Sequence, residues 1–131
     1  MQNLFIGKGN LGDSPKLKHV QKVDGGTFVV ANMRVMFARW GQDDAGNMVQ
    51  VGGFWREVEI YGGKAEACAK HLRKGARVLV IGEERDFLAK DESEQEVQVI
   101  KVVAEDVALQ LSRIESIVFA PPKSRSQEGQ E

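Results

Sequence analysis

A strand, a short helix and a second strand follow one another between Phe54 and Gly82, and this order constrains the fold more than any other feature of the chain. Residues 54–61 alternate between two faces, as a strand does. One face carries Trp55, Glu57, Glu59 and Tyr61, and the other carries Phe54, Arg56, Val58 and Ile60. Residues 64–72 place Ala65, Cys68, Ala69 and Leu72 at helical spacing. Residues 77–81 then read as a buried strand that ends at Gly82.

The segments on either side of this unit predict more strands. We expect strands over residues 3–11, 27–40 and 96–111, and a polar hairpin arm over residues 16–23 that ends in the turn Asp24-Gly25-Gly26. A helix is the rival interpretation of residues 27–40, but β-branched and aromatic side chains dominate there. Residues 41–53 and 88–95 are expected to be loops.

Five strands with one short helix between the third and the fourth define an all-β protein, a β-barrel of the oligonucleotide/oligosaccharide-binding type, or OB-fold. We therefore assign residues 1–112 to one OB-fold domain. Residues 113–131 form a C-terminal extension, which we expect to be disordered from about residue 120 because it has no apolar pattern after its prolines.

Composition excludes several classes of protein. No apolar run approaches the roughly 20 residues that cross a bilayer, and the N-terminus does not resemble a signal peptide, so a cytoplasmic protein without membrane contact is expected. One cysteine and two scattered histidines predict no metal site, and we expect no cofactor. No nucleophile arrangement and no phosphate-binding loop is present, which predicts a protein that is not an enzyme.

The charge is divided unevenly along a chain whose formal net charge is −1. Residues 1–82 carry 12 Lys and Arg against 7 Asp and Glu, a net of +5. Residues 83–112 carry 3 Lys and Arg against 9 Asp and Glu, a net of −6. The totals argue against a protein that holds nucleic acid by bulk charge, but they leave room for a local basic face opposite an acidic region.

Six short motifs, in order and spacing, resemble the bacterial single-stranded DNA-binding protein (SSB) family over residues 2–112. They are Ile6 to Pro15, Val30 to Val35, Phe54 to Val58 after Trp40, Tyr61 to Glu66, Leu72 to Gly75, and Val78 to Gly82. Each motif alone is a weak signal, and the set is a strong one. The chain resembles a divergent member, of the kind that plasmids or other mobile elements carry.

The resemblance implies a protein that binds and protects single-stranded DNA with little sequence preference, in replication, recombination and repair. Stacking of bases on aromatic rings contributes ~1–3 kcal/mol per base, and Lys and Arg follow the phosphates. The family implies a homo-oligomer, a tetramer or else a dimer. Its members recruit replication or repair proteins through an acidic tip that ends in Pro-Phe, and this tip is not seen at residues 128–131.

The candidate site residues fall into two groups. The aromatic candidates are Trp40, Trp55, Tyr61 and Phe87, the last as a substitute for a family tryptophan. The cations that the resemblance places near the strand are Lys8, Arg34, Arg56, Lys64, Arg73, Lys74 and Arg85. Packing in a core or between subunits is the alternative for Trp55, and packing at a loop is the alternative for Trp40.

Two acids depart from the family pattern. Glu57 and Glu59 separate Trp55 from Tyr61 on one strand face, where the family favours neutral or basic residues. They predict weaker phosphate attraction, or else a surface for a protein partner. The alternative function is therefore an OB-fold protein-interaction module, a primosome-type accessory factor with weak nucleic-acid binding. An RNA-binding role is a third possibility, although the sequence shows no device for the 2′-hydroxyl.

Overall fold

The computed structural model describes residues 2–123 and confirms a mostly β protein with one short helix. Its elements are β1 (Leu4–Leu11), β2 (Lys16–Gln21), β3 (Thr27–Gln42), β4 (Met48–Tyr61), α1 (Gly63–His71), β5 (Arg77–Lys90), β6 (Glu96–Leu109) and the 3-10 turn η1 (Leu111–Arg113). The hairpin arm forms a strand of its own, β2, paired with β3 from Lys16 opposite Asn32 to Gln21 opposite Thr27. The helix therefore lies between β4 and β5 rather than between the third and fourth strands.

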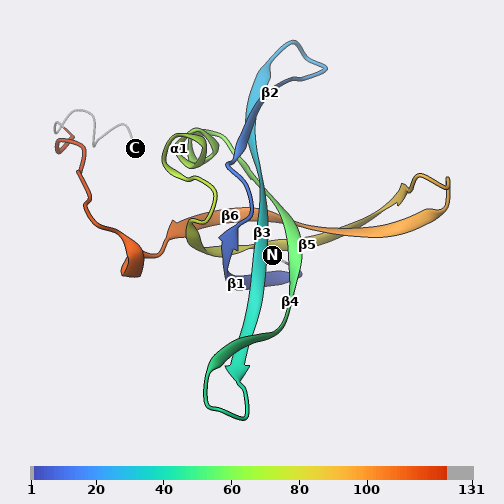
Figure 1. The fold of residues 1–131 in the computed structure, drawn as a ribbon. Helices are drawn as coiled ribbons and strands as arrows, with labels where there is room; N and C mark the ends of the chain where they lie inside the picture. The colour runs from blue at the N-terminus through green and yellow to red at the C-terminus, as the bar shows by residue number, and fades with distance from the viewer. Residues whose placement is uncertain (1, 124–131) are drawn as a thin grey trace.

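The sheet closes on itself into a barrel because β1 pairs with two strands. Its order is β1-β5-β6-β4-β3-β2, and β1 also pairs with β3 through Asn10 and Leu11. Strands β4 and β6 run parallel, whereas the other pairs are antiparallel. Figure 1 shows α1 at one end of this barrel. Closure bends β5 at a bulge between Ile81 and Gly82, where a side chain would collide with the backbone of Val103 on β6.

The core lies inside the barrel and beneath α1, and the predicted alternation supplies it. On β4, Val58 and Ile60 are buried while Trp55 and Tyr61 are exposed. The helix contributes Ala65 and Cys68, and burial raises the pKa of the Cys68 thiol. The buried cluster consists of Leu11, Ala31, Met33, Val35, Phe37, Val58, Ile60, Ala65, Cys68, Leu72, Val78, Val80, Val102 and Ala104.

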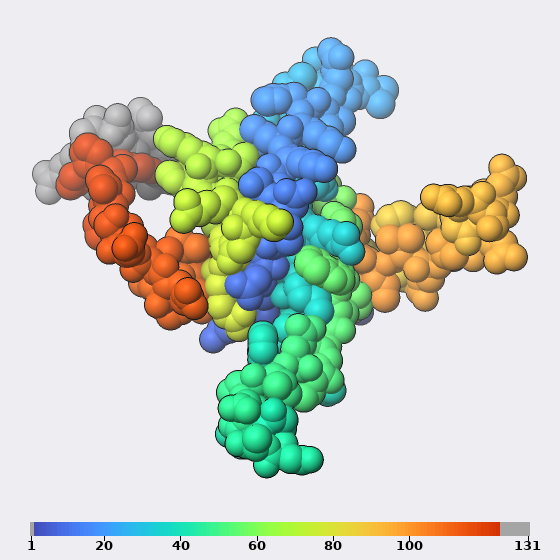
Figure 2. All heavy atoms as spheres, in the orientation of Figure 1, coloured from blue at the N-terminus to red at the C-terminus, as the bar shows by residue number. Residues whose placement is uncertain are grey.

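The two predicted long loops are shorter than expected, and this part of the prediction is wrong. Strand β3 runs to Gln42 and β4 begins at Met48, so residues 41–53 are mostly paired. Likewise β5 runs to Lys90, which leaves only residues 91–95 as a turn. Both turns are held by an aspartate, Asp43 or Asp91, whose Oδ1 accepts two backbone N–H groups. Figures 1 and 2 show the resulting hairpin arms, together with the β2–β3 arm, projecting from the barrel.

The chain after the barrel is only partly described. Strand β6 ends at Leu109, two residues before the predicted end, and η1 follows. Val118 and Phe119 are almost fully exposed. The disorder predicted from about residue 120 falls mainly on residues 124–131, which lie outside the described residues. Within residues 2–123, no helix is long and apolar enough to cross a membrane.

Candidate nucleic-acid interface

The outer face of β4 carries the two aromatic residues that the alternation predicted to be exposed. Trp55 and Tyr61 are each 44 % exposed. Trp55 lies opposite Met36 on β3, and Met36 in turn pairs with Asn10 on β1. The outer surface is therefore continuous from β1 across β3 to β4, because these strands are hydrogen-bonded neighbours. Rings exposed in this way have faces available to unstacked bases.

Trp55 is held between an arginine and a glycine. The Arg34 guanidinium carbon lies 4.6 Å from the centre of the Trp55 ring, which is cation–π distance. The far edge of the ring lies against Gly12, whose N–H donates to the Arg34 carbonyl at 2.8 Å. A Cβ at residue 12 would stand 2.5 Å from Trp55 Cζ3, which is too close. Glycine at this position therefore sets the orientation of the indole.

We expect Gly12→Ala to displace the Trp55 ring while leaving the barrel folded, because the nearest atoms that must move belong to that ring. The change should alter the tryptophan emission of the free protein and weaken binding of oligo-dT severalfold. Emission spectra and an anisotropy titration measure the two effects. Gly63→Ala, at the start of α1, is the control for the loss of a glycine, because nothing lies near its Cβ position and its φ, like that of Gly12, is not positive. Unchanged emission and affinity in Gly12→Ala would contradict the proposed seating of Trp55.

A second cluster joins Tyr61 to Phe87 across three strands. The Tyr61 hydroxyl donates to Glu59 Oε2 at 2.7 Å, and Lys101 Nζ on β6 donates to Glu59 Oε1 at 2.9 Å. Lys101 Nζ also lies 5.3 Å from the centre of the Phe87 ring on β5. Phe87 is 45 % exposed. The cluster thus presents two aromatic rings with a lysine between them.

Glu59 is consequently not the free negative charge that the sequence suggested. Burial alone would raise the pKa of its carboxyl, but the hydrogen bonds from Lys101 and Tyr61 outweigh this and hold the pKa below its usual value. The same bond to Glu59 raises the pKa of the Tyr61 hydroxyl. At neutral pH the Lys101 charge compensates the Glu59 charge, so this part of the surface does not repel phosphate as a bare acid would.

The Glu59–Lys101 pair predicts a dependence of stability on pH. A carboxyl whose folded pKa is lowered stabilises the fold above its ordinary pKa of 4.5, and this stabilisation is lost as the pH falls through the lowered value. Between about pH 6 and about pH 2, the free energy of unfolding should therefore fall more steeply in the wild type than in Glu59→Gln. Urea unfolding at a series of pH values measures the difference. Parallel curves for the two proteins would refute it.

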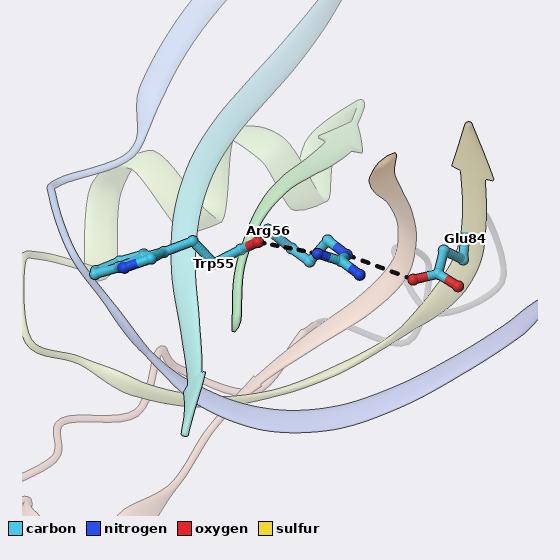
Figure 3. Close-up of polar contacts among 3 residues, drawn as sticks. All are labelled: Trp55, Arg56 and Glu84. Carbon is cyan, nitrogen blue, oxygen red and sulfur yellow. Dashed lines mark hydrogen bonds and ion pairs between the residues drawn. The ribbon is translucent and has the colours of Figure 1, made fainter. Parts of the chain in front are cut away.

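Two of the predicted cations lie away from these clusters. Arg56 points to the opposite side of β4 from Trp55 and contacts Glu84 on β5, with 3.4 Å between Nε and Oε1 (Figure 3). Its guanidinium also lies 4.3 Å from the Phe54 ring centre. Lys64, on α1, donates to Asp106 Oδ1 and to the Glu105 carbonyl, both at 2.8 Å. It lines an apolar hollow of about 220 Å³ between α1 and β6, not the aromatic surface.

Other predicted residues surround the aromatic clusters. The turn with Arg73 and Lys74 is bonded to residues 11–14, next to Gly12, through Lys74 N–H to Ser14 Oγ at 3.4 Å. Lys8 is exposed on β1, two residues before Asn10 on the outer surface. Arg85 is exposed on β5 opposite Lys101 and pairs with Glu83 at 2.9 Å.

Trp40 lies farther out than the other aromatic candidates. It is 52 % exposed and pairs with Gln50 beside a bulge on the β3–β4 arm. It lies four positions along β3 from Met36, the partner of Trp55, which corresponds to roughly 13 Å. The structure thus brings together Trp55 with Arg34, and Tyr61 with Phe87, while Trp40 extends the surface along one arm.

Some residues of this surface were not among the sequence candidates. Lys101 joins the two aromatic rings of the second cluster because it pairs with Arg85 on β5 and with Glu57 on β4. No local pattern in the sequence gives this register. The sequence pattern predicts an ordinary solvated lysine at Lys16, but Lys16 forms part of a polar hollow of about 300 Å³ beside Arg34. The lining residues of this hollow are Asp13, Ser14, Lys16, Asn32, Arg34 and Glu57.

A closed barrel with exposed rings and interspersed cations on one surface defines an OB-fold of the kind that binds single-stranded nucleic acid. A sequence model of the single-strand binding protein family matches residues 1–110, and the chain belongs to this family. The fold is similar to the crystal structure of the small single-stranded DNA-binding protein from Streptomyces coelicolor, with a TM-score of 0.69 and 15% sequence identity. The match covers 84% of this chain and 95% of the Streptomyces chain.

Proposed function

We propose that the protein binds and protects single-stranded DNA with little sequence preference, by base stacking and phosphate contacts. The observation that carries the proposal is the continuous outer surface on which Trp55 and Tyr61 are each 44 % exposed. Arg34 and the Arg73–Lys74 turn lie beside Trp55 and supply positive charge for the DNA backbone, while Lys101 neutralises the Glu59 carboxylate beside Tyr61. Family membership supports the same function.

The biological role follows from this binding. The protein would hold DNA strands open and protected during replication, recombination and repair, in the cytoplasm, without catalysing a reaction. We assign the binding to residues 1–112 and treat residues 113–131 as an extension. The protein-interaction alternative is less well supported, because Lys101 and Tyr61 bond the Glu59 carboxylate, one of the two acids that suggested it.

Assembly into a homotetramer is part of the proposal. On β1, Leu4 and Ile6 are 60 % and 61 % exposed, and Ile6 lies opposite Ile81 on β5. Side chains of this kind on the outside of a barrel are better accommodated between copies of the chain than in water. A tetramer would bring several binding surfaces to one DNA strand and raise its apparent affinity.

The solution mass with and without oligo-dT tests the proposal. We expect the mass of four chains alone, and the same assembly with DNA bound after oligo-dT is added. A duplex of equal length should not compete at equal concentration, because its bases are not free to stack. A mass that does not change on addition of oligo-dT would overturn the binding function, and a monomer mass would overturn the assembly.

A further inference from the structure

We propose that the polar hollow beside Trp55 is a nucleobase pocket that favours guanine at one position of the bound strand. The proposal rests on the proposed DNA-binding function and adds a base preference to it. The hollow has a volume of about 300 Å³, at the small end of ligand sites, which suits a single base. It lies between β2, β3 and β4 and the segment that precedes β2.

The hollow is next to the stacking surface because Arg34 belongs to both. The Arg34 side chain lies over the Trp55 ring and also lines the hollow. Glu57 lies two residues along β4 from Trp55, on the same outer face. A strand whose base stacks near Trp55 would therefore bring a neighbouring base to the opening of the hollow.

Glu57 is available to a ligand. It stands directly opposite Arg34 in the register of β3 and β4, yet the two do not form an ion pair, because the Arg34 guanidinium lies over Trp55. Among residues 2–123, the Glu57 side chain takes part in no ion pair and in no hydrogen bond. Its neighbour Glu59 differs, since Lys101 and Tyr61 bond both of its oxygens.

The lining offers acceptors and donors together. Glu57 and Asp13 present carboxylate oxygens, although one Asp13 oxygen already accepts the Ser14 N–H at 2.9 Å. Lys16 and Arg34 present charged donors, and Asn32 presents both a donor and an acceptor. Lys16 and Asn32 face each other across β2 and β3. The hollow therefore suits a polar ligand that carries both acceptors and donors.

Among the bases, guanine matches this arrangement best. Its O6 and N7 accept hydrogen bonds, which lysine and arginine supply, and its N1–H and 2-amino groups donate to a carboxylate. Thymine offers one N–H between two carbonyl oxygens, so a carboxylate that approaches it meets two acceptors. Unstacked bases in single strands are read on these edges. Glu57, which would otherwise repel the phosphates, thereby has a favourable contact with the strand.

Three oligonucleotides of equal length test the proposal: oligo-dT, a repeat of guanine and thymine, and the same repeat with inosine for guanine. Inosine keeps the purine ring and lacks only the 2-amino group, so stacking is matched. Anisotropy titrations in lithium chloride avoid guanine tetrads. We expect the wild type to bind the guanine repeat about fivefold or more tighter than the inosine repeat. In Glu57→Ala this ratio should fall to near one.

The ratio is measured within each protein, so a general change in affinity cancels. Glu66→Ala, which removes an exposed acid from α1, should keep the wild-type ratio. A wild-type ratio near one, or an unchanged ratio in Glu57→Ala, would overturn the guanine pocket while binding of oligo-dT left the proposed function intact. Failure of all three oligonucleotides to bind would overturn both.

Discussion

Replacement of Trp55 by alanine should weaken binding of single-stranded DNA by ~1–3 kcal/mol, which is roughly 5- to 150-fold in Kd. The ring is 44 % exposed on the outer face of β4 and is oriented by Arg34 and Gly12. Its removal deletes a stacking platform and leaves the buried neighbours Val58 and Ile60 in place. Anisotropy titrations with labelled oligo-dT and oligo-dC should show the same relative loss, because every base has a stacking face.

Phe119→Ala is the matched control for Trp55→Ala. Phe119 is an aromatic residue that is 86 % exposed, but it lies beyond the barrel, after η1. Its removal should leave the affinity unchanged. Equal losses of DNA affinity in the two variants, or no loss in Trp55→Ala, would contradict the role assigned to the β4 face. Trp55 would then be a packing residue, the alternative given by the sequence.

Ile60→Ala should lower the free energy of unfolding by ~2–5 kcal/mol. Ile60 lies on the inner face of β4, is 2 % exposed and belongs to the core cluster that α1 covers. Alanine removes three carbon atoms and leaves a cavity that the closed barrel cannot fill, because β4 is held by β3 and β6. Urea unfolding at a fixed protein concentration measures the loss, since association also contributes to stability.

Val51→Ala provides the comparison on the same strand. Val51 is 49 % exposed on the β3–β4 arm, so its truncation should change the stability by about 0.5 kcal/mol or less. A similar loss in Val51→Ala and Ile60→Ala would mean that β4 is not divided into a buried and an exposed face as described.

The barrel was predictable because alternation and helical spacing are direct signals of burial. The alternation of side chains along the strand was enough to place Val58 and Ile60 on one face and Trp55 and Tyr61 on the other, and the structure has the same division. The lengths of the arms were not predictable in the same way. Residues 41–53 include four glycines and read as a loop, but backbone pairing between β3 and β4 does not need apolar side chains.

The candidate site was predictable to the extent that exposure on one strand decides it. Contacts between strands that are far apart in the sequence were not predictable, because they depend on the register in which the strands pair. The bond between Glu59 and Lys101 joins residues 42 apart, and the bond between Lys64 and Asp106 likewise spans 42. The first compensates an acid that was expected to weaken phosphate attraction, and the second engages a cation that was expected to bind DNA. Alternation itself puts Arg56 on the face opposite Trp55.

A fluorescence titration with oligo-dT at several salt concentrations tests the central claim most directly. Stacking on Trp55 should quench the tryptophan emission at low salt, and phosphate contacts should make log K fall linearly with log[salt], with a slope of about −0.7 per phosphate neutralised. This result would support a strand of DNA on the outer face of β4. Absence of quenching at low salt, or an affinity that does not change with salt, would contradict it.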